Sequence, residues 1–89
     1  MKFVINTCFG GYGFSQDFLN KYGWEIGSLK RNDPKLIAAV EELGEAESSG
    51  FFSKLHIVEV PDDYTDYYIE EHDGIEDIIY VKDGKLHWA

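Results

Sequence analysis

The chain has 89 residues, a mass of 10.2 kDa and a net charge of −9. This length suits one domain with a single modest core and excludes two domains. Its content of 44% hydrophobic and 16% aromatic residues predicts a folded globular protein, and no apolar run approaches the roughly 20 residues that cross a bilayer, so no membrane partner is expected.

The charge is concentrated in the second half of the chain. Residues 1–40 hold five basic and three acidic side chains (net +2), whereas residues 41–89 hold three basic and fourteen acidic ones (net −11). Nucleic-acid binding depends on Lys and Arg, so this acidity argues against direct contact with DNA or RNA. It is compatible with a basic protein partner, or with a solvated face that keeps a small protein in solution.

The first elements are a strand, a glycine-rich loop and a capped helix. Residues 3–5 are apolar and predict the strand, glycines follow at 10, 11 and 13, and Ser15 is placed to cap a helix that ends at Gly23. Free N–H groups in such a loop can hold phosphate, although the Walker lysine and the GxGxxG spacing are both missing. The alternative is a tight connection without a ligand.

We therefore expect a phosphorylated small molecule, a nucleotide-type signal, to bind at this loop. Asn6 and Thr7 would contact its polar edges, and Tyr12 would stack on its base. So short a chain rarely encloses a nucleotide alone, so a homo-oligomer is expected as well. The predicted ligand-binding residues are Asn6, Thr7, Cys8, Gly10, Gly11, Tyr12, Gly13 and Ser15.

Cys8 raises the question of catalysis. A thiol beside a helix N-terminus can be a nucleophile if a histidine lies nearby, but none of the three histidines has the spacing of a catalytic partner. We predict an inert, buried cysteine and no enzyme, with a Cys8-dependent activity as the alternative. The lone cysteine and the absence of a secretory leader predict a reducing cytoplasm, and no cofactor is expected.

The middle of the chain predicts a second helix. In residues 24–31 the apolar side chains are too irregularly spaced for a clear strand and Gly27 interrupts a helix, so a loop or a short strand is expected. Asp33 followed by Pro34 is a helix start, and Gly44 marks the end. The buried face of this helix is expected at Leu36, Ile37, Val40 and Leu43, and residues 45–50 read as a polar connection.

The last part of the chain predicts a meander. Residues 55–60 alternate apolar and polar side chains, segments 66–74 and 77–84 each end in Asp-Gly, and 85–88 forms a last short strand. The predicted fold class is α+β: a single domain over residues 1–89, ordered β-α-α-β-β-β-β, with an antiparallel or mixed sheet and two helices packed on one face.

The carboxylates of the second half are candidates for metal binding or for a partner face. Their spacing is not that of an EF-hand, so no metal is expected. The alternative to ligand binding is then an acidic face that masks a basic host protein, and imitation of nucleic acid is one form that this masking takes. Its residues would be Asp62, Asp63, Asp66, Glu70, Glu71, Glu76 and Asp77.

Four segments carry a resemblance to a known group of proteins. INTCFGG, NDPKLIAAVEELG, LHIVEVPDD and YYIEEHDGIE resemble a family of small acidic proteins encoded by bacteriophages and prophages. The resemblance spans most of the chain and implies a phage or prophage origin and expression in a bacterial cytoplasm. Small phage proteins of this kind commonly interfere with host machinery, including host defence. No catalytic residues are implied.

Overall fold

The computed structural model describes all of residues 1–89 and contains one α+β domain. A 3₁₀ helix at Trp24–Ser28 lies between the first two α-helices. The elements in chain order are β1 (Lys2–Asn6), α1 (Gln16–Tyr22), the 3₁₀ helix, α2 (Pro34–Leu43), α3 (Glu45–Ser48), β2 (Leu55–Glu59), β3 (Asp66–His72), β4 (Ile75–Lys82) and β5 (Lys85–Trp88).

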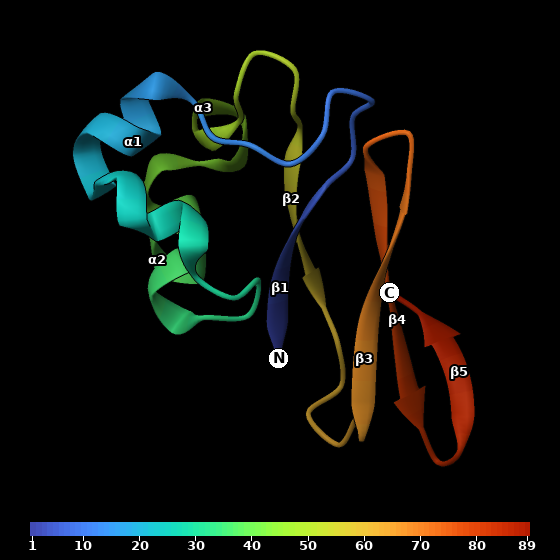
Figure 1. The fold of residues 1–89 in the computed structure, drawn as a ribbon. Coiled ribbons are helices and arrows are strands. Elements are labelled where there is room, and N and C mark those ends of the chain that lie inside the picture. The colour runs from blue at the N-terminus through green and yellow to red at the C-terminus, as the bar shows by residue number, and fades with distance from the viewer.

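The strands form two antiparallel sheets. β1 and β2 make a two-stranded ribbon, and β3, β4 and β5 make a three-stranded meander in that order. Figure 1 shows the helices on one side of the ribbon and the meander on the other. The ribbon is therefore the middle of three layers.

The alternation of side chains along β1 explains this middle position. Successive strand residues point to opposite faces. Val4 belongs to the helix-side core with Phe18, Leu36, Val40 and other residues, whereas Phe3 and Ile5 pack with Val60 and Ile78 on the meander side. Because both faces are covered, β1 reads as a continuous apolar run (Phe3, Val4 and Ile5), and the chain has two small cores.

Hydrogen bonds from other segments of the chain cap both edges of the ribbon. The edge of β1 is covered by Arg31, whose carbonyl accepts from Val4 N (2.9 Å), and by Glu76, whose Oε1 accepts from Asn6 N (2.8 Å). On β2, Ser49 Oγ accepts from Leu55 N (2.8 Å) and Glu45 Oε2 accepts from Ile57 N (2.9 Å). Unpaired strand edges invite pairing with other chains, and these contacts block both edges.

The prediction for α2 is confirmed at both ends. Asp33 Oδ1 accepts from Lys35 N (2.8 Å), Pro34 is the first helical residue, and Gly44 takes a φ of 98° at the C-cap. Leu36, Ile37 and Val40 are buried, and each such side chain contributes about 1.5–3 kcal/mol when fully buried. Ala39 is buried too, whereas Leu43 is only half-buried at the helix end.

The α+β class, the single domain and the antiparallel strands are confirmed, and three details differ from expectation. There are two sheets because the turn at Pro61–Tyr64 carries β3 away from β2 onto the other face of the ribbon. Residues 24–28 form a 3₁₀ helix rather than a loop or strand. The polar connection 45–50 contains α3, a single helical turn with its N-cap at Gly44 and its C-cap at Ser49.

Candidate functional site

The glycine loop lies between β1 and α1, in contact with two other loops. Ser15 caps α1 by accepting from Phe18 N (3.1 Å), and Gly11 has a φ of 94°. A Cβ on Gly10 would overlap the carbonyl oxygen of Phe52. A Cβ on Gly74, in the turn between β3 and β4, would overlap the carbonyl oxygen of Phe9. Two of these glycines thus serve close packing, and Gly11 serves backbone conformation.

The backbone of this loop keeps free donors. The N–H groups of Gly10 to Phe14 make no hydrogen bond within the chain, and the next N–H, of Ser15, is bonded to Ser48 O (2.8 Å). Free N–H groups of this kind can bind an anion. The helix that follows has only 7 residues, so its dipole adds little.

The side chains predicted to contact the ligand are used inside the protein. Asn6 is fully buried: its Nδ2 donates to Cys8 O (2.7 Å) and Gly74 O (2.6 Å), and its Oδ1 accepts from Lys54 N (2.8 Å). Thr7 Oγ1 donates to Lys54 O (2.9 Å). These bonds hold three loops together and leave Asn6 no free polar atom.

Tyr12 stacks on an arginine instead of facing solvent. The Arg31 guanidinium carbon lies 3.4 Å from the centre of the Tyr12 ring. The same guanidinium forms a bidentate ion pair with Glu76, with Nη1 2.6 Å from Oε1 and Nη2 2.8 Å from Oε2. Sequence reasoning missed this cluster, because Arg31 and Glu76 are 45 positions apart. One face of the Tyr12 ring is thus occupied.

The Tyr12 hydroxyl is buried and has no hydrogen-bond partner. Burial raises the pKa of Tyr12 to about 12 from its ordinary 10.0; the Arg31 charge lowers it and the Glu76 charge raises it further, both by less. The buried phenol is therefore stable only in its neutral form.

Replacing Tyr12 with phenylalanine should change the alkaline stability of the protein. The pKa of Tyr12 is 10.0 in the unfolded chain and about 12 in the folded one. Its contribution to stability is therefore fully present below pH 10, and it is lost as the pH rises to 12, because the unfolded chain releases the proton first. The wild type should lose up to about 1.4 kcal/mol per pH unit more than Tyr12→Phe across this window. Urea titrations at pH 8–12 measure this, and parallel profiles for the two proteins would contradict it.

The other loop candidates have simpler surroundings. Cys8 is half-buried and its thiol forms no disulfide. Its backbone N–H donates to Asn6 Oδ1, with the nitrogen 3.4 Å from that oxygen. Gly13 has no close neighbour at its Cβ position. No three His, Cys, Asp or Glu side chains lie close enough together to hold a metal ion.

The acidic candidates do not form one face. Asp66, Glu70 and Asp77 share the outer face of the meander, which no other element covers. Asp62 and Asp63, in the turn before β3, pair with the Met1 amine (2.5 Å) and Lys82 Nζ (3.6 Å). Glu71, also exposed, caps the β3–β4 turn by accepting from Gly74 N (2.9 Å).

The assignment of Glu76 to an exposed acidic face is corrected by its burial. Glu76 is only 6% exposed, and its carboxylate accepts hydrogen bonds from Arg31 and from Asn6 N. Glu76, Ile78 and Tyr80 are every second residue of β4, so all three side chains point to the same face, toward the ribbon. This period of two was the signal that could have placed Glu76 inside.

Apolar side chains on the outer face also went unnoticed in the sequence. The strand register aligns Tyr68, Ile79 and Trp88 in one row and Asp66, Val81 and Leu86 in the next. Tyr68, Leu86 and Trp88 are 46%, 51% and 62% exposed, while Ile79 between its neighbours is 2% exposed. We call the side chains of Asp66, Tyr68, Glu70, Asp77, Ile79, Val81, Leu86 and Trp88 the outer sheet face.

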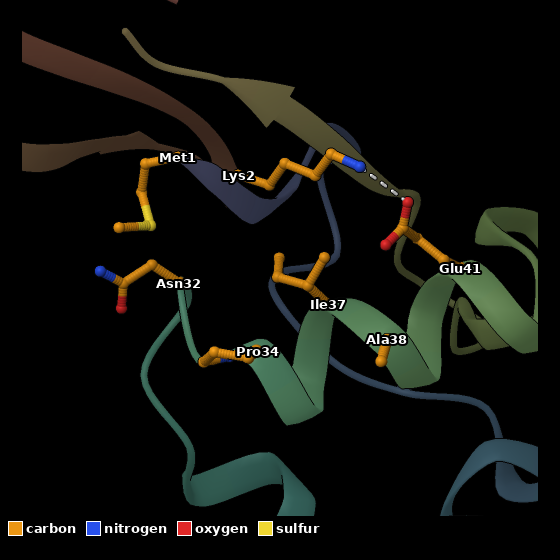
Figure 2. A pocket seen from close by; sticks show the side chains of 7 residues that line it. All are labelled: Met1, Lys2, Asn32, Pro34, Ile37, Ala38 and Glu41. Carbon is orange, nitrogen blue, oxygen red and sulfur yellow. Dashed lines mark hydrogen bonds and ion pairs between the residues drawn. The ribbon is translucent and has the colours of Figure 1, made fainter. Parts of the chain in front are cut away.

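A pocket of about 250 Å³ lies between the start of β1 and the first turns of α2 (Figure 2). It is lined by Met1, Lys2, Asn32, Pro34, Ile37, Ala38 and Glu41. Lys2 Nζ is paired with Glu41 (2.9 Å), as the dashed line in Figure 2 marks, so its charge is already neutralised. No predicted ligand-binding residue lines this pocket, and it is smaller than the roughly 300–1,000 Å³ of most ligand sites.

Comparison with known protein families, curated proteins and solved structures finds no match to this chain. None of its helices has the length and apolar character needed to span a membrane.

Proposed function

We propose that this protein is a non-catalytic binding protein whose outer sheet face masks a basic surface of a host protein. The observation that carries the proposal is an uncovered sheet face that exposes Tyr68, Leu86 and Trp88 beside the carboxylates of Asp66, Glu70 and Asp77. Exposed apolar rows with a charged rim are the usual anatomy of a protein interface.

The chemistry of this face favours arginine and lysine as its partners. An arginine can stack its guanidinium on Tyr68 or Trp88 and pair with a neighbouring carboxylate. Aromatic side chains are also the commonest energetic centres of interfaces. The net charge of −9 adds long-range attraction for a basic protein.

One pair on the outer sheet face works against the stability of the fold. Glu70 and Asp77 are directly opposite on β3 and β4, and both are exposed. Like charges at such positions destabilise a sheet. A basic side chain from a partner would sit between them and relieve the repulsion, which supports a binding role for this pair.

Binding of a phosphorylated small molecule is the second candidate, supported by the free N–H groups of Gly10 to Phe14. It has weaker support, because Asn6, Thr7 and Tyr12 are engaged inside the protein. A melting temperature raised by inorganic phosphate or ATP in the wild type, but not in Gly11→Val, would favour this candidate over the outer sheet face.

The resemblance to phage and prophage proteins directs the search for a partner to bacteria. We infer that the protein acts in the bacterial cytoplasm on a host protein, including one of host defence, without contacting nucleic acid itself. A basic nucleic-acid-binding protein is the expected class of target, since its binding surface suits an acidic face.

The test is capture from bacterial lysate by the immobilised protein. The wild type should capture a basic protein, and Glu70→Gln with Asp77→Asn should weaken that complex roughly tenfold or more, because the partner's cations lose their counter-charges. Raising the salt from about 0.05 M to 0.5 M should weaken it as well. The affinity of the purified pair is then measured by calorimetry.

Asp17→Asn with Glu47→Gln is the matched control, because it removes two exposed negative charges from the helical side of the molecule. It should leave the affinity nearly unchanged. Equal losses in the two double variants would show an effect of net charge alone. Either that result or a complex indifferent to salt would overturn the proposal.

A further inference from the structure

The outer edge of β5 has the fewest hydrogen-bond partners of the sheet edges in this chain. Hydrogen bonds from other segments cap the edges of β1 and β2. On β3 one outward N–H group, that of Tyr67, donates to the Asp66 carboxylate (2.8 Å), and the strand carries the acidic residues Asp66, Glu70 and Glu71. No side chain or loop makes a hydrogen bond to the outer edge of β5, and β5 lies at the far side of the meander in Figure 1. A bare strand edge is a template for another strand.

The ladder between β4 and β5 decides which groups face outward. Ala89 N donates to Ile78 O (3.0 Å), and His87 is opposite Tyr80. Hydrogen-bonded positions recur at every second residue, so His87 bonds to β4 while Leu86 and Trp88 direct their N–H and C=O groups to the free edge. These two residues also carry the most exposed apolar side chains of β5.

Charge leaves this edge open to a second copy of the chain. β5 contains Lys85 and His87 and no acidic residue, and Asp83 in the adjoining turn lies between Lys82 and Lys85 in sequence. The carboxylates of the meander are on β3 and β4. The mutual repulsion expected from a net charge of −9 is therefore weakest at β5.

We propose that two copies of this chain pair through their β5 edges, antiparallel and around a two-fold axis at His87. In this register Leu86 of each copy is opposite Trp88 of the other. The free N–H of each residue then donates to the free C=O of its opposite residue, and the apolar side chains meet on the outer face. A two-fold axis requires such self-complementarity, and Leu86 and Trp88 supply it.

The pairing joins the two meanders into one sheet. The row of Tyr68, Ile79 and Trp88 continues into Leu86 and Val81 of the second copy, while the carboxylates of β3 stay at the two ends. The outer sheet face is doubled rather than covered, so this inference does not depend on what that face binds.

A cysteine at position 87 tests both the dimer and its register. In a Cys8→Ser background, His87→Cys should form a disulfide-linked dimer in the presence of oxidised glutathione. Residues opposite each other at a non-hydrogen-bonded position have Cα atoms about 4.5 Å apart, within the range that a disulfide spans. Lys85→Cys is the control and should stay monomeric, because in this register its two copies are about 13 Å apart along the strands.

Sedimentation equilibrium supplies the second readout. The wild type should show a concentration-dependent dimer, and Leu86→Pro should raise its dissociation constant at least tenfold, since it removes an edge N–H without touching the bonds to β4. Leu86→Ala keeps that N–H and should weaken the dimer less. Circular dichroism checks that each variant is folded. A monomeric wild type at millimolar concentration would overturn the dimer, and a disulfide at position 85 rather than 87 would overturn the register.

Discussion

Replacing Glu76 with glutamine should lower the free energy of unfolding by about 3 kcal/mol or more, because it leaves the Arg31 guanidinium inside the protein without its counter-charge. The two side chains are 7% and 20% exposed, so solvent replaces little of the lost interaction. Glu76 Oε1 also accepts from Asn6 N, which links the ion pair to the edge of β1. Urea unfolding at neutral pH measures the change.

Asp77→Asn is the matched control for this variant, since Asp77 is the next residue on the same strand and points to the opposite face. Its removal relieves the repulsion with Glu70, so stability should stay within about 0.5 kcal/mol of the wild type or rise. Similar losses in both variants would show that Glu76 behaves as one more surface carboxylate.

A double-mutant cycle separates the ion pair from its surroundings. Arg31→Met alone should also destabilise the protein, because Glu76 is then the unpaired charge. Arg31→Met combined with Glu76→Gln should cost clearly less than the two single losses added together. Additive losses would mean that the two groups stabilise the fold independently of each other.

The parts of the fold that sequence could predict are those decided by local chemistry. Asp33, Pro34 and Gly44 specify α2 because a capping carboxylate, a fixed φ and a positive φ act within the helix itself. The Asp-Gly pairs specify the hairpins for the same reason, and Asp73 and Asp83 both take a φ of 53°. These elements needed no knowledge of distant contacts.

The candidate site could not be predicted in the same way, because its contacts join distant parts of the chain. An aromatic ring in a glycine loop suits a nucleotide base and an arginine equally well, since both stack on its π face. Only the folded chain brings Arg31 to Tyr12. The acidic residues of 66–77 likewise lie in two different environments, because successive side chains of β4 point alternately to the interior, as Glu76 does, and to the outer sheet face, as Asp77 does.

Replacing Gly74 with alanine should be far more harmful than the same change at Gly84, although the two glycines hold the same place in equivalent turns. Each follows an aspartate with a φ of 53°, and their own φ values are 90° and 73°. Alanine at a positive φ costs about 1–2 kcal/mol, so Gly84→Ala should lose about that much. A Cβ at Gly84 meets no atom within 4 Å.

At Gly74 the backbone cost is only the first part of the loss. A Cβ there would overlap the Phe9 carbonyl oxygen and lie 2.7 Å from Gly11 N, and both are backbone atoms that cannot rotate away. The turn would have to leave the glycine loop, breaking the bond from Asn6 Nδ2 to Gly74 O (2.6 Å). Gly74→Ala should therefore lose about 3 kcal/mol or more in urea unfolding.

Amide spectra then locate the damage. In Gly74→Ala the backbone amide signals of residues 9–13 should shift, whereas in Gly84→Ala they should keep their wild-type positions, because the β4–β5 turn has no neighbour to displace. If both variants lose the same stability and leave these signals unchanged, the β3–β4 hairpin does not pack on the glycine loop. The shape of that loop would then have to come from Gly11 and the Ser15 cap alone.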